Sequence, residues 1–179
     1  MTQLFGKPLV TQEAMRTRIK ELGRDITQYY QHKDLVLVGV LKGAFMFYAD
    51  LVRAIRLPVT VDFMIVKSQL RGNTTGKVKV LTDLTEEIQG RDVLLVEDIV
   101  DSGLTVQHLT RQLSKRKPKS LQVCALLSKP ARRQIDVNVH YIGFEIPNHY
   151  VVGYGLDYQQ QYRNLPYLAV LDPKSVEAP

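Results

Sequence analysis

The stretch "VLLVEDIVDSGLT", residues 93–105, carries the clearest information about fold and function in this sequence. Its apolar start, residues 93–97, is typical of a strand buried on both faces of a parallel sheet. The run leads into Glu97, Asp98 and Asp101, three carboxylates that repel one another. Because open α/β sheets bind ligands beyond the carboxyl ends of their strands, this acidic strand end predicts a ligand site.

The residues that follow the acidic pair predict a phosphate site at the start of a helix. They are Asp101, Ser102, Gly103, Leu104 and Thr105, and a helix is expected over residues 104–115. Glycine lets the backbone approach a ligand, the first N–H groups of a helix attract anions, and the two hydroxyls add donors. Glu97 and Asp98 would repel that phosphate and instead suit a sugar or a magnesium ion. A sugar phosphate satisfies both halves. The alternative is that Asp98 or Asp101 caps the helix and Glu97 pairs with a surface lysine, but it does not account for the strand, the acidic pair and the Gly-Thr helix start occurring together.

The rest of the chain alternates between strand and helix patterns. Helical spacing of apolar residues or helix-like composition predicts helices over residues 15–26, 43–55 and 104–115, with Thr11 as the cap of the first. Apolar runs predict strands over residues 35–40, 59–66, 93–97, 120–127, 137–146 and 167–172, and a short strand near residues 77–81. We therefore expect an α/β fold with a mostly parallel sheet, in a single domain spanning residues 1–179.

Composition excludes several classes of protein. The 179 residues are 45% hydrophobic and 23% charged, which is typical of a globular chain. No run is long enough to cross a membrane, no signal peptide is evident, and the single Cys124 lies in an apolar run, so we expect a cytoplasmic protein without membrane partners. The net charge of +6 is spread along the chain, with one cluster at residues 114–119 that suits a helix end. Small anionic substrates therefore account for the charge as well as nucleic acid does, and no nucleic-acid partner is expected.

Residues 97–105 resemble the 5-phosphoribosyl-1-pyrophosphate (PRPP) motif of type I phosphoribosyltransferases. Three further segments, "LKGAFMF" (41–47), "LLSKPARR" (126–133) and the long run from residue 143 to residue 171, resemble the hypoxanthine-guanine members of that family. The resemblance extends from about Val36 to Leu171. It implies the type I fold, a central sheet flanked by helices, with a mobile loop at about residues 68–77 and a small hood region.

The resemblance assigns the PRPP side of the site residue by residue. Glu97 and Asp98 would hold the ribose hydroxyls and magnesium, with Asp157 reaching a second magnesium through water. The loop of residues 101–105 would bind the 5-phosphate. Pyrophosphate would meet Leu41, Lys42, Gly43, Ser68 and Arg163, with a cis peptide bond between the first two residues.

The purine side follows in the same way. Lys129 would donate to the 6-oxo group, Tyr150 would stack on the base, Val151 would offer backbone groups and Asp157 would border the ring. Asp101 would act as the general base that removes a proton from N7. Gln69 departs from the family pattern, which has tyrosine after the loop serine, so we expect a less tightly sealed closed state and some PRPP hydrolysis.

The implied reaction transfers phosphoribose from PRPP to N9 of hypoxanthine or guanine, with magnesium as cofactor, in purine salvage. The family generally forms homodimers or homotetramers. Two alternatives stay open: a regulator that senses PRPP or nucleotides on the same fold, for which a nucleic-acid-binding segment is the expected sign, and a xanthine-preferring relative. Lys129 and Tyr150 argue against a pyrimidine substrate.

Overall fold

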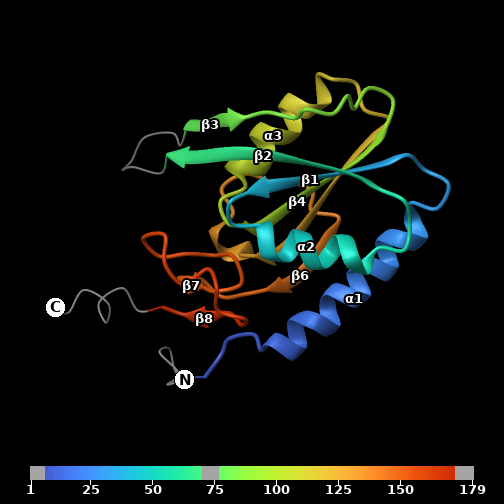
Figure 1. Cartoon of the computed structure of the whole chain (residues 1–179). Helices are drawn as coiled ribbons and strands as arrows, with labels where there is room; N and C mark the ends of the chain where they lie inside the picture. Colours follow the sequence, from blue (N-terminus) through green and yellow to red (C-terminus); the bar gives the residue numbers. More distant parts are fainter. Residues whose placement is uncertain (1–6, 70–76, 172–179) are drawn as a thin grey trace.

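The computed structural model describes residues 7–69 and 77–171 and contains two sheets (Figure 1). The main sheet has the strand order β3-β2-β1-β4-β5-β6, and β7 and β8 form a small second sheet. The strands are β1 (Leu35–Leu41), β2 (Thr60–Gln69), β3 (Lys77–Thr82), β4 (Asp92–Val100), β5 (Ser120–Ser128), β6 (Tyr141–Glu145), β7 (Val151–Val152) and β8 (Ala169–Val170). Five strands of the main sheet run parallel and β3 pairs antiparallel at its edge, which confirms the expected mostly parallel sheet.

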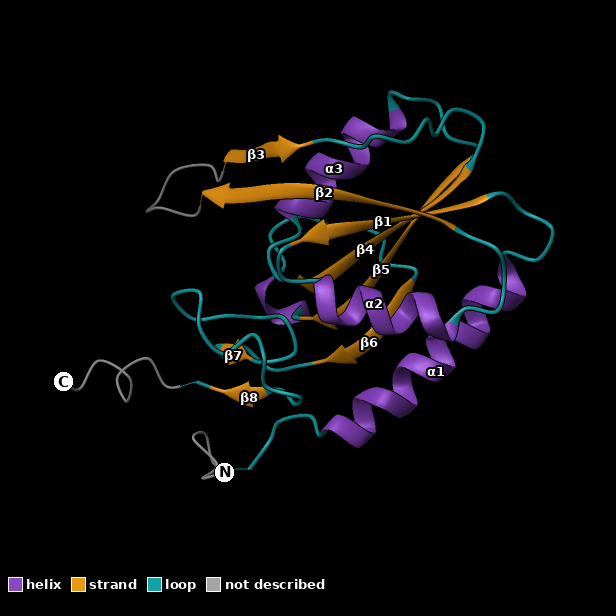
Figure 2. Ribbon diagram, viewed as in Figure 1, coloured by secondary structure: helices purple, strands orange, loops and turns teal. Residues whose placement is uncertain are grey.

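Helices cover both faces of the main sheet, as Figure 2 shows. Helices α1 (Gln12–Tyr29) and α2 (Phe45–Ala54) pack on one face, while α3 (Leu104–Ser114) packs on the other. Each face has its own apolar core, and the central strands β1, β4 and β5 are buried along most of their length. Among the described residues, no helix is both long enough and apolar enough to cross a bilayer.

The predicted first helix is confirmed and extends by three residues at each end. Met15, Ile19, Leu22 and Ile26 recur at helical spacing and are all buried. The Oγ1 of Thr11 accepts a hydrogen bond from the main-chain N–H of Ala14 at 3.2 Å, so the predicted cap is present. Cys124 is buried in the core, as expected.

The segment over residues 137–146 was predicted as one strand, and its first part is not a strand. Pairing with β5 begins only at Tyr141, which lies opposite Cys124. Val137 and Val139 instead pack against the core on the α3 face, so their alternation reflects contact with that core rather than a place in the sheet. Their burial without strand pairing explains why the hydrophobic pattern was misleading.

Two other strands differ in extent from the prediction. β4 continues to Val100, three residues beyond the predicted end at Glu97, so Asp98 lies within the strand rather than after it. In the predicted strand 167–172, Ala169–Val170 pairs with β7, and Leu168 forms an isolated bridge with Val10. The small antiparallel sheet of β7 and β8 corresponds to the expected hood. The expected loop 68–77 is shortened because β2 extends to Gln69 and β3 begins at Lys77. The remaining part of that loop prediction falls outside the described residues.

The strand order places a ligand site between β1 and β4. The chain moves from β1 to β2 in one direction and from β4 to β5 and β6 in the other. Parallel strands that diverge in this way leave a crevice at their carboxyl ends, where ligands of open α/β sheets bind. Residues 41–43 and 97–105 are the segments that meet there.

Candidate active site

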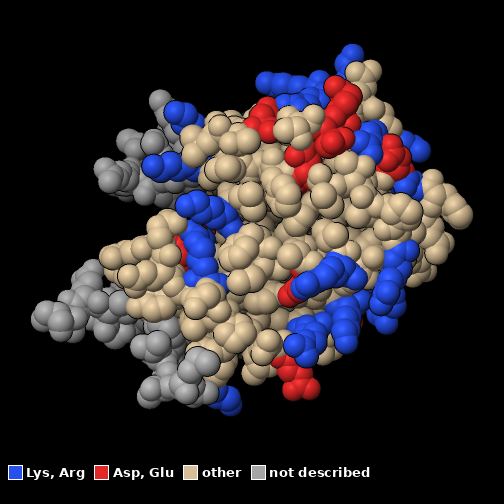
Figure 3. Space-filling view, viewed as in Figure 1, with Lys and Arg blue, Asp and Glu red and all other residues tan. Residues whose placement is uncertain are grey.

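A cavity of about 410 Å³ lies at the carboxyl ends of β1 and β4. In Figure 3 the molecule is hollowed between β2 and the β7-β8 sheet, and Lys and Arg side chains border the hollow. The cavity brings together most residues that were predicted to bind PRPP, namely Leu41, Lys42, Gly43, Glu97, Asp98, Asp101, Ser102, Gly103, Thr105, Asp157 and Arg163. The side chain of Ser68 is not among those that the structure describes.

Glu97 is the most deeply buried acid of this cavity. Only 4% of the residue is exposed, and its Oε1 has no hydrogen-bond partner among the described residues. Burial, together with the neighbouring Asp98, raises the pKa of Glu97 well above its usual range. A buried carboxylate oxygen without a partner is unfavourable for folding and suits a ligand that supplies cations or hydroxyl donors.

Asp98 lies directly against the loop that follows β1. A Cβ added to Gly43 would come within 1.6 Å of Asp98 Oδ2, so only glycine allows this approach. Burial raises the pKa of Asp98 to about 6, even though the N–H of Ile99 and the charge of Arg163 act in the opposite direction. The peptide bond between Leu41 and Lys42 is cis, as the resemblance implied.

The loop before α3 has the form expected of a phosphate cradle. Gly103 has a φ of +88° and occupies the cap position of α3, where it has no side chain to cap the helix. Ser102 Oγ accepts a long hydrogen bond, at 3.4 Å, from the N–H of Leu104, the first residue of the helix. Its missing side chain also matters, because a Cβ there would lie 2.7 Å from the carbonyl oxygen of Ile135. The N–H groups of Gln134 and Ile135 both donate to the carbonyl oxygen of Ser102, at 3.0 and 3.2 Å. Neighbouring main chain therefore holds the loop in place, and the start of α3 can present N–H groups to an anion.

Arg163 and Asp157 form one wall of the cavity. Arg163 Nη2 lies 2.8 Å from Asp157 Oδ1, and Nη1 of the same arginine donates to the carbonyl oxygen of Gly155 at 2.7 Å. The Arg163 side chain is only 19% exposed, so the guanidinium is fixed by the β7-β8 region. Such a preorganised fork suits an oxyanion.

A second cavity of about 480 Å³ adjoins the first and shares Asp98, Ile99, Asp101 and Asp157 with it. The predicted purine-binding residues Lys129, Tyr150 and Val151 line this second cavity. Tyr150 is 47% exposed, and its hydroxyl donates to the carbonyl oxygen of Asp157 at 3.0 Å. Burial and the charge of Asp157 raise the pKa of Tyr150, so the hydroxyl remains a donor near neutrality.

Asp101 stands between the two cavities and is held by two cations. Lys129 Nζ lies 3.7 Å from Asp101 Oδ2, and Arg132 Nε donates to Oδ1 at 3.0 Å. Lys129 is 7% exposed, so it is not the surface lysine that its place before Pro130 alone would favour. The two cations hold the carboxylate of Asp101 in a fixed orientation.

The sequence reasoning assigned no role to Arg132 and Arg133. Arg133 Nη2 donates to Ser128 Oγ at 2.9 Å, and its Nη1 donates to the carbonyl oxygen of Asp101 at 3.4 Å. Both arginines fall within the quoted segment 126–133, so their presence was visible, but only the fold brings them against Asp101.

The comparisons with known proteins agree with this geometry. Residues 7–159 match the model of the phosphoribosyl transferase domain. The hypoxanthine phosphoribosyltransferase of Salmonella typhimurium is 51% identical over 163 residues, which cover 89% of this chain and 92% of the relative. The hypoxanthine-guanine phosphoribosyltransferase of Bacillus subtilis is 45% identical over 175 residues, which cover 96% of each chain.

Solved structures lead to the same conclusion. A crystal structure of a hypoxanthine phosphoribosyltransferase from Staphylococcus aureus superimposes with a TM-score of 0.92 at 43% identity, over 97% of this chain and 95% of that one. A ternary substrates complex of a mutant hypoxanthine phosphoribosyltransferase from Trypanosoma cruzi superimposes with a TM-score of 0.89 at 41% identity, over 96% of this chain and 98% of that one. On the domain match, the identities and the shared fold, this chain belongs to the phosphoribosyl transferase family.

Proposed function

We propose that this protein transfers the 5-phosphoribosyl group of PRPP to N9 of hypoxanthine or guanine in purine salvage. The products are inosine or guanosine monophosphate and pyrophosphate. One observation carries the proposal: a cavity with a phosphate cradle and a cavity lined by Lys129 and Tyr150 meet at Asp98, Asp101 and Asp157. The names of the relatives support the same reaction.

PRPP is assigned to the first cavity, with its 5-phosphate on the first turn of α3 and the loop of residues 101–105. The ribose hydroxyls are assigned to Glu97 and Asp98, whose carboxylates can only accept hydrogen bonds when ionised. The pyrophosphate is assigned to Arg163 and to the backbone of Leu41, Lys42 and Gly43, with Ser68 as a further contact. The Arg163 fork matches a phosphate oxygen pair in shape and charge.

The purine is assigned to the second cavity. The buried Lys129 has only donors, so it distinguishes a 6-oxo group from the 6-amino group of adenine. Tyr150 offers a half-exposed ring for stacking, which contributes roughly 1–3 kcal/mol for an aromatic-base contact. Val151 and Asp157 border the ring in this assignment.

Asp101 is the proposed general base. In the ligand-free protein its carboxylate is shared between Lys129 and Arg132. When the 6-oxo group draws Lys129 away, one oxygen of Asp101 is released toward the proton on N7, while Arg132 keeps the carboxylate in position. Binding of a 6-oxopurine thereby frees Asp101 to accept the proton, because Lys129 interacts with Asp101 in the ligand-free protein and with the purine in the complex.

Magnesium is the proposed cofactor. Within the described part of the chain, no three His, Cys, Asp or Glu side chains are grouped to hold a metal. Magnesium usually takes one or two carboxylates together with substrate phosphates and water. The carboxylates of Asp98 and Asp157 and the unpartnered Oε1 of Glu97 fit this set of ligands. When bound there, magnesium neutralises charge on the leaving pyrophosphate.

A panel of hypoxanthine, guanine, xanthine, adenine and uracil, each with PRPP and magnesium, tests the proposal by nucleotide formation. We expect turnover with the 6-oxopurines, and Asp101→Asn should lower it by about 100-fold or more while PRPP affinity changes little. A strong preference for xanthine would replace the substrate assignment. Absence of turnover with every base would refute the enzyme and favour a regulator that senses PRPP or nucleotides.

A further inference from the structure

A third cavity, of about 440 Å³, lies between α1 and the end of α2. It shares no lining residue with the two cavities of the proposed active site. It is formed by residues 12–20 of α1, the end of α2, Arg56 and Tyr154. Its floor is apolar, because Met15 and Ile19 are buried beneath it. Nothing in the proposed reaction uses this cavity.

Four cations surround the cavity. Arg16 and Lys20 lie one turn apart on α1. Arg53 lies in the last turn of α2, and Arg56 follows two residues after the helix ends. Figure 3 shows this gathering of basic side chains over α1 and α2, with acidic side chains beside them. The sequence did not reveal it, because each helix contributes only part of the cluster.

Asp50 is the only carboxylate in the lining, and it is already engaged. It pairs with Arg53 and accepts a hydrogen bond from the hydroxyl of Tyr154. Among the described residues, Arg16, Lys20 and Arg56 have no ion-pair partner. Three uncompensated cations around one hollow repel one another, and an anion in the hollow removes that repulsion.

We propose that this cavity binds a small molecule that carries two or more linked phosphate groups. A single phosphate engages one or two cationic side chains, whereas linked phosphates span cations that enter from both helices. Arginine forks match phosphate oxygens in pairs, and three of the four cations are arginines. The concave shape and limited volume favour a small ligand over an extended nucleic acid or a membrane surface.

Inorganic tripolyphosphate without added magnesium is the probe, and amide chemical shifts of the intact protein are the readout. We expect saturable shifts at residues 12–20 and 53–56. The variant Arg16→Gln/Lys20→Gln/Arg56→Gln should bind at this place at least 10-fold more weakly. The variant Arg111→Gln/Lys115→Gln/Lys119→Gln loses the same charge from exposed sites at and after the end of α3 and should bind like the original protein.

Three outcomes would overturn the proposal. They are shifts that grow without saturation, equal weakening in both variants, and saturable shifts confined to residues 41–43 and 101–105, where a polyphosphate enters the proposed active site. Circular dichroism establishes that both variants are folded. Because this experiment measures binding and not turnover, its failure would not affect the proposed phosphoribosyl transfer, which the panel of purine and pyrimidine bases tests separately.

Discussion

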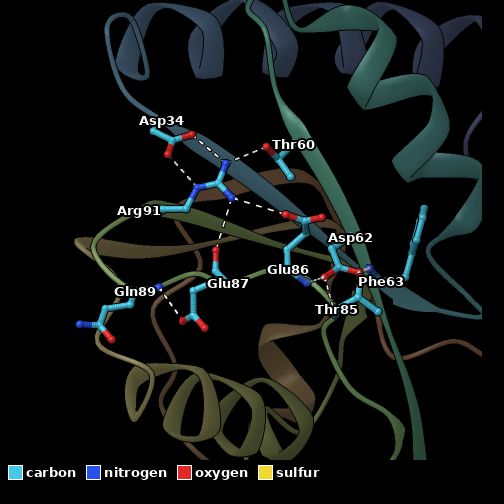
Figure 4. A network of polar contacts seen from close by, with 9 residues as sticks. All are labelled: Asp34, Thr60, Asp62, Phe63, Thr85, Glu86, Glu87, Gln89 and Arg91. Carbon is cyan, nitrogen blue, oxygen red and sulfur yellow. Dashed lines mark hydrogen bonds and ion pairs between the residues drawn. The ribbon is translucent and has the colours of Figure 1, made fainter.

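Two buried carboxylates of the main sheet differ in how well the protein satisfies them with hydrogen bonds. Asp62, on β2, is 6% exposed, and Glu97, on β4, is 4% exposed. Asp62 Oδ2 accepts hydrogen bonds from the N–H groups of Thr85 and Glu86, both at 2.8 Å, and Oδ1 accepts one from Phe63 at 2.7 Å (Figure 4). Oε1 of Glu97 has no partner among the described residues.

The pKa shifts of the two acids express this difference. Burial by itself raises the pKa of Asp62, but the N–H donors of Glu86, Phe63 and Thr85 outweigh it and hold that pKa below its usual range. Burial of Glu97 is not offset, so its pKa lies well above the usual range. A satisfied buried acid stabilises the fold, whereas an unsatisfied one costs stability and is retained for a ligand.

The largest expected effect is on activity, from Glu97→Gln. We expect turnover to fall by about 100-fold or more, because the amide cannot supply the charge that magnesium and a ribose becoming cationic require. The free energy of unfolding in urea should stay within about 1 kcal/mol of the original value or rise, since a buried charge is removed. A strongly destabilised Glu97→Gln protein would contradict the contrast with Asp62.

Asp62→Asn should have the reverse profile. Its amide nitrogen would face either the N–H of Phe63 or the N–H groups of Thr85 and Glu86, so charge-assisted hydrogen bonds are lost and a donor meets a donor in both orientations. We expect the free energy of unfolding to fall by roughly 2–3 kcal/mol, measured by urea denaturation. Turnover per folded molecule should be unchanged, and a variant as stable as the original would show that Asp62 does not hold the segment at residues 85–86.

The same contrast predicts opposite dependences of stability on pH. Acids with a raised folded-state pKa, Glu97 and Asp98, bind more protons folded than unfolded, so the metal-free protein loses stability as pH rises above about 4. The contribution of Asp98 is lost as pH rises through about 6. Asp62, with a lowered pKa, contributes stability that is lost as pH falls below about 4. Between pH 4.5 and 7 we expect Tm to fall by roughly 2–6 °C, and Asp98→Asn should flatten that slope. An unchanged slope in Asp98→Asn would remove Asp98 from the explanation.

Much of this architecture was readable from the sequence, because it depends on local patterns. Buried strands, the α1 spacing with its Thr11 cap, and the acidic strand end before Gly103 each have a periodic or short-range signature. The resemblance added the cis bond after Leu41, which no local pattern predicts.

The rest required tertiary information. Val137 and Val139 alternate as strand residues do, yet they pack on the α3-side core without pairing. Arg132 gains its importance only because η1 (Pro130–Arg132) turns it toward Asp101. The Asp62 network likewise joins β2 to residues more than 20 positions further along the chain, so no local sequence pattern in either segment predicts it.

The smallest predicted effect concerns Arg91, which lies beside the Asp62 network in Figure 4. Its guanidinium binds both oxygens of Asp34, at 2.7 and 2.8 Å, and donates to Thr60 Oγ1 at 2.7 Å. Arg91→Lys removes this fork, but the Asp34 side chain is 66% exposed, so we expect a loss of only about 1 kcal/mol in urea denaturation. Arg24→Lys, at an arginine that is 75% exposed and 3.5 Å from Asp25, is the matched control and should change nothing measurable. If Arg91→Lys lost as much stability as Asp62→Asn, the ion pair between Arg91 and Asp34 would matter as much to stability as the buried Asp62 does.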